Sequence, residues 1–597
     1  MFAIMRASRT PSSPSTPSTP SAPTAPSAPP LDRAPAPAAT RRALLGVGLA
    51  AAGTAALSAC TGSGGSAHGG HGGPHGPSAS GAPAPQGFVA PDGPEVAAAE
   101  AARGKGPVRA VRLTATAAAL DLGAGRTVRS WAYGGELPGK EVRVTAGDTL
   151  ALTLANHLPQ ATSLHWHGLA LRNDMDGVPG LTQRDIAPGT EFTYRFAVPH
   201  PGTYWFHPHS GTQQDRGLYA PLIVEDPKEP LAYDAEWVVV LDDWLDGVDG
   251  STPDAVLAEL SRGMGGGHAG HSGGHGGGHE GHAAGGGDSG DGTAGTGGAG
   301  GHAGHGPAAS PASPAPAGSG GPSRMMMGAT SDLLGGDAGD VAYPYYLVNG
   351  RTAEAPAEFR AKPGDRVRLR IVNAGGDTAF RVALGGHRMT VTHTDGFPVR
   401  PVETGALLIG MGERYDVLVT AGDGVFPLVA AAEGKKAAAL AVLRTGRGAA
   451  PAASVRPKEL AGPVLDAARL KAAEPVALAA RKPDRTVRIR LTGGMARYDW
   501  AFDGRPYTPD QRHPVKAGER VRLVFTNATE MWHPLHLHGH TFALGGPGGP
   551  RKDTAVILPG ETLTADFDAD NPGLWMLHCH NVYHAEAGMM TVLGYRR

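Results

Sequence analysis

One strand pattern occurs three times in this chain, and it restricts the fold to repeated β-domains. In residues 142–156, 359–373 and 513–527, a glycine and an acidic residue lead into alternating apolar and polar side chains, and an asparagine follows nine residues after the glycine. This alternation has the period of a half-buried strand, and a repeated unit indicates several copies of one domain. Short strands separated by turn signals then predict an all-β protein of three Greek-key β-sandwich domains.

The repeats also set the expected domain boundaries. The three domains are predicted at residues 107–227, 228–448 and 475–597, with a connector at 449–474. Two stretches are too rich in glycine, histidine, alanine and proline to form a core, so we expect disorder in a linker at 61–106 and an insert at 262–335. The insert carries seven histidines and the triplet Met325-Met326-Met327.

Residues 1–60 have the features of an export signal. Arg41-Arg42 precedes a weakly apolar run, which resembles a twin-arginine signal, and Leu57-Ser58-Ala59-Cys60 resembles a bacterial lipobox. An ordinary signal peptide with an incidental cysteine is the alternative. We therefore predict export by the twin-arginine pathway and an extracytoplasmic protein held at the cell membrane by lipid on Cys60. With 53 basic and 55 acidic residues, the chain shows no nucleic-acid footprint, and we expect a monomer.

Four His-X-His pairs indicate a metal cluster. Two histidines one residue apart on a strand point to the same face, so each pair presents two imidazoles together. The middle repeat has no such pair, which suggests that it is a spacer and that the cluster lies where the outer domains meet. The eight histidines are His165, His167, His207, His209, His536, His538, His578 and His580.

A second kind of site is predicted within the third domain. Cys579 has no partner for a disulfide, because the only other cysteine is Cys60. Together with His533 and His584 it supplies a thiolate and two imidazoles, and Met589 follows ten residues after the cysteine. This is the ligand set of a blue, electron-transferring copper. Met590 is an alternative axial ligand. His578 and His580 flank Cys579, so the thiolate offers a short covalent path into the cluster.

The motifs at 165–168, 207–209, 533–540 and 578–589 resemble the four copper motifs of three-domain multicopper oxidases, the family of laccases and cuprous oxidases. The resemblance implies cupredoxin-like domains, four copper ions and the reduction of dioxygen to water. It assigns type 1 copper to His533, Cys579, His584 and Met589, and type 2 copper to His165 and His536. It assigns the type 3 pair to His167, His207, His209, His538, His578 and His580.

Formation of two waters consumes four protons, so carboxylates are needed beside the cluster. Asp176 matches the acidic residue that the family has near type 2 copper; a loop aspartate before Gly177 is the alternative. Many bacterial relatives have a glutamate directly after the second type 1 histidine. Here that position is Ala585, and Glu586 follows it. Glu586 is our candidate for the second proton route.

The electron donor is the open question. Electrons are expected to enter through an exposed edge of His533 or His584. Met531 matches a methionine that holds Cu(I) in copper-resistance oxidases, and Glu530 could help to bind the cation; Met531 could equally pack in the core. The His/Met-rich insert suits copper capture, or is only a spacer. We therefore favour oxidation of Cu(I) to Cu(II), with a laccase acting on phenols and aromatic amines, or a non-enzymatic copper-binding protein, as alternatives.

Overall fold

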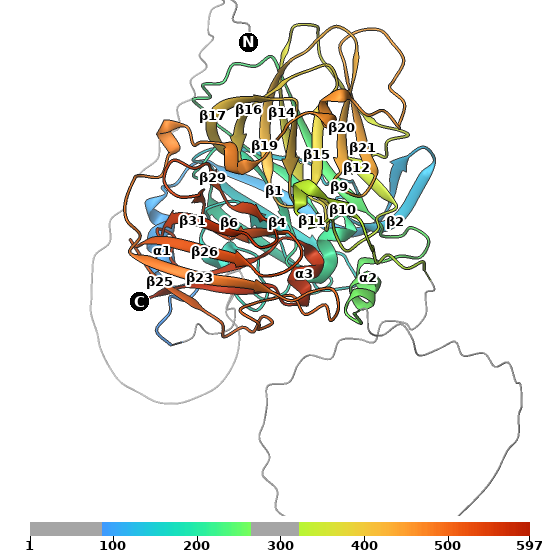
Figure 1. Cartoon of the computed structure of the whole chain (residues 1–597). Coiled ribbons are helices and arrows are strands. Elements are labelled where there is room, and N and C mark those ends of the chain that lie inside the picture. The colour runs from blue at the N-terminus through green and yellow to red at the C-terminus, as the bar shows by residue number, and fades with distance from the viewer. Residues whose placement is uncertain (1–85, 264–320) are drawn as a thin grey trace, which may run out of the picture. The chain divides into compact units, whose positions relative to one another are not determined.

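The computed structural model describes residues 86–263 and 321–597 (Figure 1). Contacts divide the chain into Met1–His75 and Gly76–Arg597, and every described residue belongs to the second unit. The export signal, the lipid anchor at Cys60 and the seven histidines of the insert lie outside the described residues, so these stay predictions. No helix in the described ranges is long and apolar enough to cross a membrane.

The first domain is a sandwich of two four-stranded sheets. One sheet, in the order β2-β1-β4-β6, consists of β1 (Val108–Gly123), β2 (Arg126–Tyr133), β4 (Thr149–Asn156) and β6 (Glu191–Ala197). The other, in the order β3-β8-β7-β5, consists of β3 (Val142–Thr145), β5 (His165–His167), β7 (Gly202–His207) and β8 (Ala220–Glu225).

The middle domain has two six-stranded sheets. The sheet β12-β9-β14-β19-β16-β17 is built from β9 (Ala235–Trp244), β12 (Tyr345–Val348), β14 (Arg366–Asn373), β16 (Met389–Thr394), β17 (Phe397–Thr404) and β19 (Arg414–Thr420). The sheet β13-β21-β20-β15-β18-β22 is built from β13 (Ala357–Arg360), β15 (Phe380–Leu384), β18 (Ala406–Ile409), β20 (Val425–Ala432), β21 (Ala437–Arg444) and β22 (Val464–Leu465).

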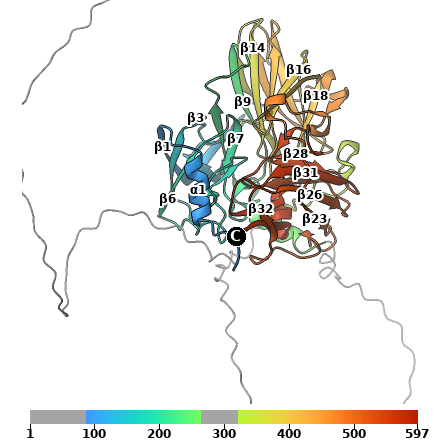
Figure 2. The ribbon, with the colours of Figure 1, turned by 90° about the vertical axis from the view of Figure 1, so that its left-hand side faces the viewer.

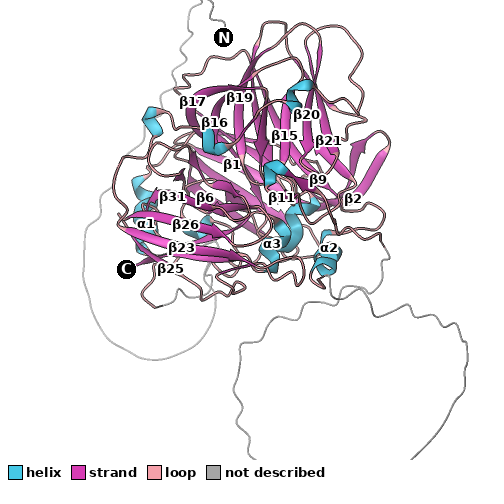
Figure 3. Cartoon of the chain, in the orientation of Figure 1, coloured by secondary structure: helices cyan, strands magenta, loops and turns pink. Residues whose placement is uncertain are grey.

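The third domain repeats the sandwich with six and five strands. Its first sheet, β24-β23-β26-β31-β28-β29, contains β23 (Arg485–Thr492), β24 (Ala501–Phe502), β26 (Arg520–Asn527), β28 (Phe542–Leu544), β29 (Arg551–Lys552) and β31 (Thr562–Asp568). Its second sheet, β25-β33-β32-β27-β30, contains β25 (His513–Lys516), β27 (His533–Leu537), β30 (Thr554–Ile557), β32 (Leu574–Cys579) and β33 (Met590–Arg596). Figure 3 shows how strongly strands dominate, and Figure 2 separates the first (blue), middle (yellow) and third (red) domains. The predicted fold class is confirmed.

The repeated asparagine has the same role in all three domains. The Asn156 amide donates to the carbonyls of Gln160 and Ile186, and its side-chain oxygen accepts from the Leu158 N–H. Asn373 and Asn527 make the equivalent bonds at the ends of β14 and β26. Each asparagine satisfies the backbone groups of the loop that leads to the next strand. In the outer domains that strand is β5 or β27, which carries histidines.

The two stretches expected to be disordered contain ordered structure, and the connector contributes a strand. Within the linker, α1 (Pro94–Ala102) buries Val96, and the Val89 N–H donates to the Tyr595 carbonyl. The described C-terminal part of the insert, residues 321–335, buries Leu334 and contributes β10 (Thr330–Ser331), which pairs with β11 (Gly336–Asp337) in a short hairpin. The connector at 449–474 contributes β22, parallel to β18. A few apolar anchors therefore outweigh an unfavourable average composition.

Candidate metal centre

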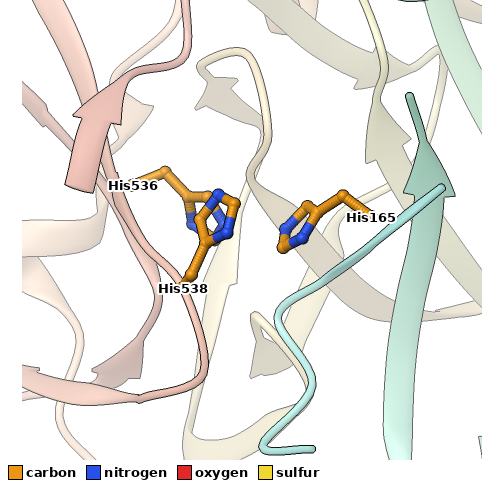
Figure 4. A group of neighbouring side chains, drawn as sticks. All are labelled: His165, His536 and His538. Carbon is orange, nitrogen blue, oxygen red and sulfur yellow. The ribbon is translucent and has the colours of Figure 1, made fainter. Parts of the chain in front are cut away.

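The eight predicted imidazoles meet between the first and third domains. β5 pairs with β7, which sets His165 opposite His207, and β27 pairs with β32, which sets His536 opposite His578. On β5 the alternation directs Trp166 into the core, where its ring contacts Phe196 and Phe206, while the flanking histidines face the third domain. Figure 4 shows His165 facing His536 and His538 across this interface.

Four of the eight imidazoles form two stacked pairs, and each pair has one ring from each outer domain. The ring centroids of His165 and His538 are 3.7 Å apart, and those of His167 and His536 are 3.8 Å apart. Other pairs approach through nitrogen: His580 Nε2 lies 3.2 Å from His167 Nδ1. His209 Nε2 and His538 Nε2 lie 3.4 and 3.1 Å from His578 Nε2. The predicted convergence of the four His-X-His pairs is therefore present in the structure.

The donor set fits bound copper. Among the residues that the structure describes, four buried ring nitrogens have no hydrogen-bond partner: Nε2 of His165, His207 and His536, and Nδ1 of His580. Burial, reinforced by the neighbouring imidazoles, lowers the pKa well below its usual value for His167, His207, His209, His538, His578 and His580. These rings are therefore neutral at physiological pH, the form that binds metal. Ligand nitrogens of His165, His536 and His538 lie within 4.8 Å of one another, as do those of His165, His167 and His207.

The third domain assembles the predicted thiolate site. Cys579 Sγ lies 3.6 Å from His533 Nδ1 and 3.7 Å from His584 Nδ1, and all three side chains are fully buried. His584 is carried by α3 (Val582–Ala587), whose first turn is capped by the Asn581 side chain accepting from the Tyr583 and His584 N–H groups. The set of one thiolate and two imidazoles matches a blue-copper site.

The two candidate axial methionines lie in different environments. Met589 is fully buried in the hydrophobic cluster that also contains Cys579. Met590 begins β33, is only half-buried, and packs against a separate cluster with Leu574 and Met576. The packing therefore supports Met589 as the axial ligand.

Neither imidazole of the thiolate site has the exposed edge that we expected. His533 and His584 are both 0% exposed. The Trp500 ring covers them, with centroids 4.4 Å from His584 and 5.4 Å from His533. Their outer nitrogens are also occupied, because Thr529 Oγ1 lies 2.8 Å from His533 Nε2 and Asp340 Oδ2 lies 2.9 Å from His584 Nε2. Asp340 follows the insert, and sequence reasoning missed it because nothing local links it to His584.

The two predicted proton carboxylates lie beside the cluster. Asp176 is fully buried; its Oδ2 is 2.9 Å from His538 Nδ1, and its carbonyl is 2.8 Å from His165 Nδ1. Glu586 lines a cavity of about 30 Å³ together with His207, His209, His578 and His580. Burial, with a smaller contribution from Asp254, raises the pKa of Glu586 to about 7.

The predicted donor-binding residues are placed differently. Met531 is only 2% exposed and belongs to the core, and its carbonyl accepts from the Asn527 amide. Glu530 is exposed to solvent. The structure thus gives Met531 the packing role that was the alternative interpretation, and does not bring it together with Glu530 at a common surface.

The middle domain is more than a spacer, although it holds no imidazole of the cluster. A Cβ on Gly412 would lie 2.9 Å from His167 Cε1 and 3.0 Å from His580 Cδ2. Arg414, two residues later, forms a buried ion pair with Asp553, whose Oδ1 lies 3.1 Å from His167 Nε2. These contacts were not predictable from the absence of histidines in the middle repeat.

We expect Gly412→Ala to lower copper occupancy at the cluster. The new methyl group would displace His167 and His580, and the backbone at +84° is unfavourable for alanine. Displacing ligands in this way is expected to reduce metal affinity or oxidase activity by about 10–100-fold. Copper per chain, measured by atomic absorption after dialysis, tests this. Gly364→Ala is the matched control, since Gly364 has a φ of +88° and no atom within 4 Å of an added Cβ; equal copper loss in both variants would contradict the prediction.

Comparisons with known proteins agree with this geometry. Residues 114–229, 325–448 and 480–596 each match a multicopper oxidase family profile. The multicopper oxidase MmcO of Mycobacterium tuberculosis is 45% identical over 471 residues, covering 78% of this chain and 83% of that protein. A copper resistance protein A homolog of Pseudomonas syringae is 29% identical, covering 76% and 87%.

Among solved structures, a multi-copper oxidase from Pseudomonas thermotolerans aligns with a TM-score of 0.58 and 25% identity, covering 82% of this chain and 99% of that one. The family uses four copper ions, and the residues that would hold them are assembled here. The chain therefore belongs to the multicopper oxidase family and is an oxidase.

Proposed function

We propose that this oxidase acts in copper resistance by oxidising Cu(I) to Cu(II), with dioxygen as the final acceptor. The observation that carries the proposal is the position of Asp340, which links a methionine-bearing surface segment to His584. The naming of similar proteins for copper resistance supports it further.

Asp340 connects the surface to the thiolate site. Its Oδ2 lies 2.9 Å from His584 Nε2 and accepts a hydrogen bond of 2.9 Å from the Tyr498 hydroxyl. Its Oδ1 is buried and has no hydrogen-bond partner. The Asp340 carbonyl accepts from the Met326 N–H at 2.7 Å, and Met325 pairs with Val341 in an isolated bridge. The methionine triplet is therefore attached to the segment that carries Asp340.

The same segment offers soft ligands to solvent. Met327 is 64% exposed, and only one other large apolar residue in the described ranges, Val108, is similarly exposed. A thioether prefers Cu(I) to harder cations, and a neighbouring carboxylate suits a cation in either oxidation state. Met327 follows Met326, whose backbone bonds the residue that contacts His584, so this exposed methionine is suited to deliver electrons from a small metal ion.

The cover over the type 1 ligands disfavours bulky donors. Trp500 and Tyr498, which are 1% and 4% exposed, pack over His584, so a phenol ring has no direct contact with either imidazole. A laccase-type donor would have to transfer electrons through these side chains. Oxidation of phenols is the second candidate function, because the cover consists of aromatic side chains, Trp500 and Tyr498, through which a phenol would transfer its electrons to His584.

The chain's own residues have separable roles in this scheme. When bound, the four coppers supply one-electron transfer and the reduction of dioxygen to water. Asp340 and Thr529 orient His584 and His533, so that both present Nδ1 to the thiolate of Cys579. Asp176 and Glu586 place carboxyl groups beside the imidazoles that would bind the cluster, where protons are consumed.

Oxygen uptake with two donors tests the proposal. We expect the triple variant Met325→Leu, Met326→Leu and Met327→Leu, which keeps apolar volume but removes the thioethers, to raise KM for Cu(I) about tenfold, equivalent to about 1.4 kcal/mol. Turnover of a methoxyphenol should be unchanged. Met531→Leu is the matched control: its Cu(I) kinetics should stay near wild type, because Met531 is buried.

The opposite pattern would favour other interpretations. A loss of Cu(I) turnover confined to Met531→Leu would mean that Met531, and not the methionine triplet, binds the Cu(I) donor. Faster turnover of the phenol than of Cu(I), insensitive to the methionine triplet, would identify the protein as a laccase.

A further inference from the structure

We propose that Arg414, from the domain without copper ligands, is a positioning residue for the copper cluster: through Asp553 it fixes His167 and His536, one ligand from each outer domain. The proposal concerns the cluster and is independent of the electron donor.

The Arg414–Asp553 pair is bidentate and fully buried. Arg414 Nη1 donates to Asp553 Oδ1 at 2.7 Å, and Nη2 donates to Oδ2 at 2.6 Å. A planar guanidinium that binds both carboxylate oxygens fixes the orientation of the carboxylate as well as its charge. Asp553 is therefore held in one geometry.

Asp553 and the next residue contact two stacked imidazoles. Asp553 Oδ1 lies 3.1 Å from His167 Nε2, and the Asp553 carbonyl lies 3.0 Å from His536 Nδ1. Thr554 Oγ1 lies 3.1 Å from each of the same nitrogens and donates to Asp553 Oδ1 at 2.9 Å. One nitrogen on each ring is thus committed to residues 553–554.

The remaining nitrogens are those that face the cluster. With Nε2 of His167 occupied, Nδ1 is left to face His580 Nε2 at 3.2 Å. With Nδ1 of His536 occupied, Nε2 is left buried and without a partner. A carboxylate or carbonyl on one ring nitrogen sets the tautomer and leaves the other nitrogen unprotonated for metal. Residues 553–554 therefore select opposite nitrogens on the two rings.

The stacked pair of His165 and His538 also has a carboxylate beside it, that of Asp176, but in the described part of the chain this carboxylate has no arginine or lysine partner. Asp176 contacts His538 Nδ1 through Oδ2 and His165 Nδ1 through its carbonyl, as Asp553 does for its own pair. Within residues 86–263 and 321–597, however, no lysine or arginine forms an ion pair with Asp176; its Oδ1 lies 3.3 Å from His165 Nδ1 and its Oδ2 2.9 Å from His538 Nδ1. The two carboxylates differ in their second partner: Arg414 neutralises and immobilises Asp553, whereas both oxygens of Asp176 face imidazoles.

Two residues of the middle domain, Arg414 and Asp395, bind segments of the other two domains around Asp553. Arg414 Nε donates to the Thr203 carbonyl of the first domain, and its backbone N–H donates to Asp395 Oδ1. Asp395 Oδ2 accepts from the backbone N–H groups of Asp553 and Thr554, and pairs with Lys552 at 3.1 Å. Residues 552–554 are therefore bound to the middle domain by both side chains and backbone.

The test is Arg414→Met, analysed for metal as well as for turnover. We expect the variant to keep one type 1 copper with its blue absorption, and to lose copper affinity at the cluster by about 10–100-fold, with an altered type 2 EPR spectrum. Arg414→Lys, which keeps the charge without the bidentate geometry, should lie between the variant and wild type. Arg368→Met is the matched control, because Arg368 forms a buried pair with Asp416 in the same domain but does not contact the cluster; it should lose stability and keep copper.

Each remaining outcome decides the proposal. Four coppers bound at wild-type affinity with an unchanged type 2 spectrum in Arg414→Met would overturn it, as would equal copper loss in Arg368→Met. If Arg414→Met does not fold because Asp553 is left buried and unpaired, the double variant Arg414→Met with Asp553→Asn removes the stranded charge. That double variant should fold and show the same cluster defect; normal copper binding in it would also overturn the proposal.

Discussion

Replacing Cys579 with serine is expected to remove the blue absorption and to lower oxygen uptake with every donor by about 1,000-fold or more, equivalent to at least about 4 kcal/mol in the activation free energy. Cys579 is the thiolate between His533 and His584, and a serine hydroxyl does not replace it as a ligand. Its chain neighbours His578 and His580 contact His209 and His167 of the first domain, so the thiolate is also the covalent link between the two sites.

Absorption and EPR spectra with an oxygen electrode measure these effects. About three coppers per chain should remain, because the cluster ligands are untouched. Cys60→Ser removes the chain's only other cysteine and should keep both colour and activity. A blue Cys579→Ser protein would mean that another ligand set produces the colour.

The second large effect is expected for Asp176→Asn, with a loss of about 100-fold in oxygen uptake. The amide oxygen can still accept from His538 Nδ1, so copper content and blue absorption should be retained. What is lost is a buried carboxylate that faces two imidazoles of the cluster, with Oδ1 3.3 Å from His165 Nδ1 and Oδ2 2.9 Å from His538 Nδ1. Stopped-flow reoxidation of the reduced enzyme by dioxygen isolates this step from the supply of electrons.

Glu586→Gln provides the comparison within the same experiment. Glu586 lines the cavity beside His209 and His578, and we expect a smaller loss there, again with full copper content. If Asp176→Asn reoxidised as fast as wild type while Glu586→Gln did not, the proton route would run through Glu586 alone.

The sequence predicts well those features that repeat or that follow a strand period. The three asparagine-terminated strands predicted three sandwiches, and four His-X-His pairs predicted an interface cluster, because alternation on a strand decides which side chains share a face. The position of Cys579 between two cluster histidines predicted the connection between sites. These inferences need only local geometry.

What the sequence did not predict depends on contacts between distant segments. Asp340 touches His584 across 244 positions, and Arg414 pairs with Asp553 across 139. Neither aspartate lies in a distinctive motif. The buried edges of His533 and His584 were likewise unpredictable, because Trp500 of the third domain and Asp340 of the middle domain reach them from remote positions in the chain. Burial of a site by a remote segment leaves no periodic signal.

The division of ligands between domains has a consequence for how the enzyme matures. His533, Cys579, His584 and Met589 all belong to the third domain, whereas each imidazole stack needs a ring from the first domain as well. Colour therefore reports the folding of the third domain with Asp340 of the middle domain in place, and oxygen consumption also reports the docking of the first domain. A molecule arrested between these stages would be blue and inert, so the ratio of the two signals measures how far assembly has progressed in any preparation.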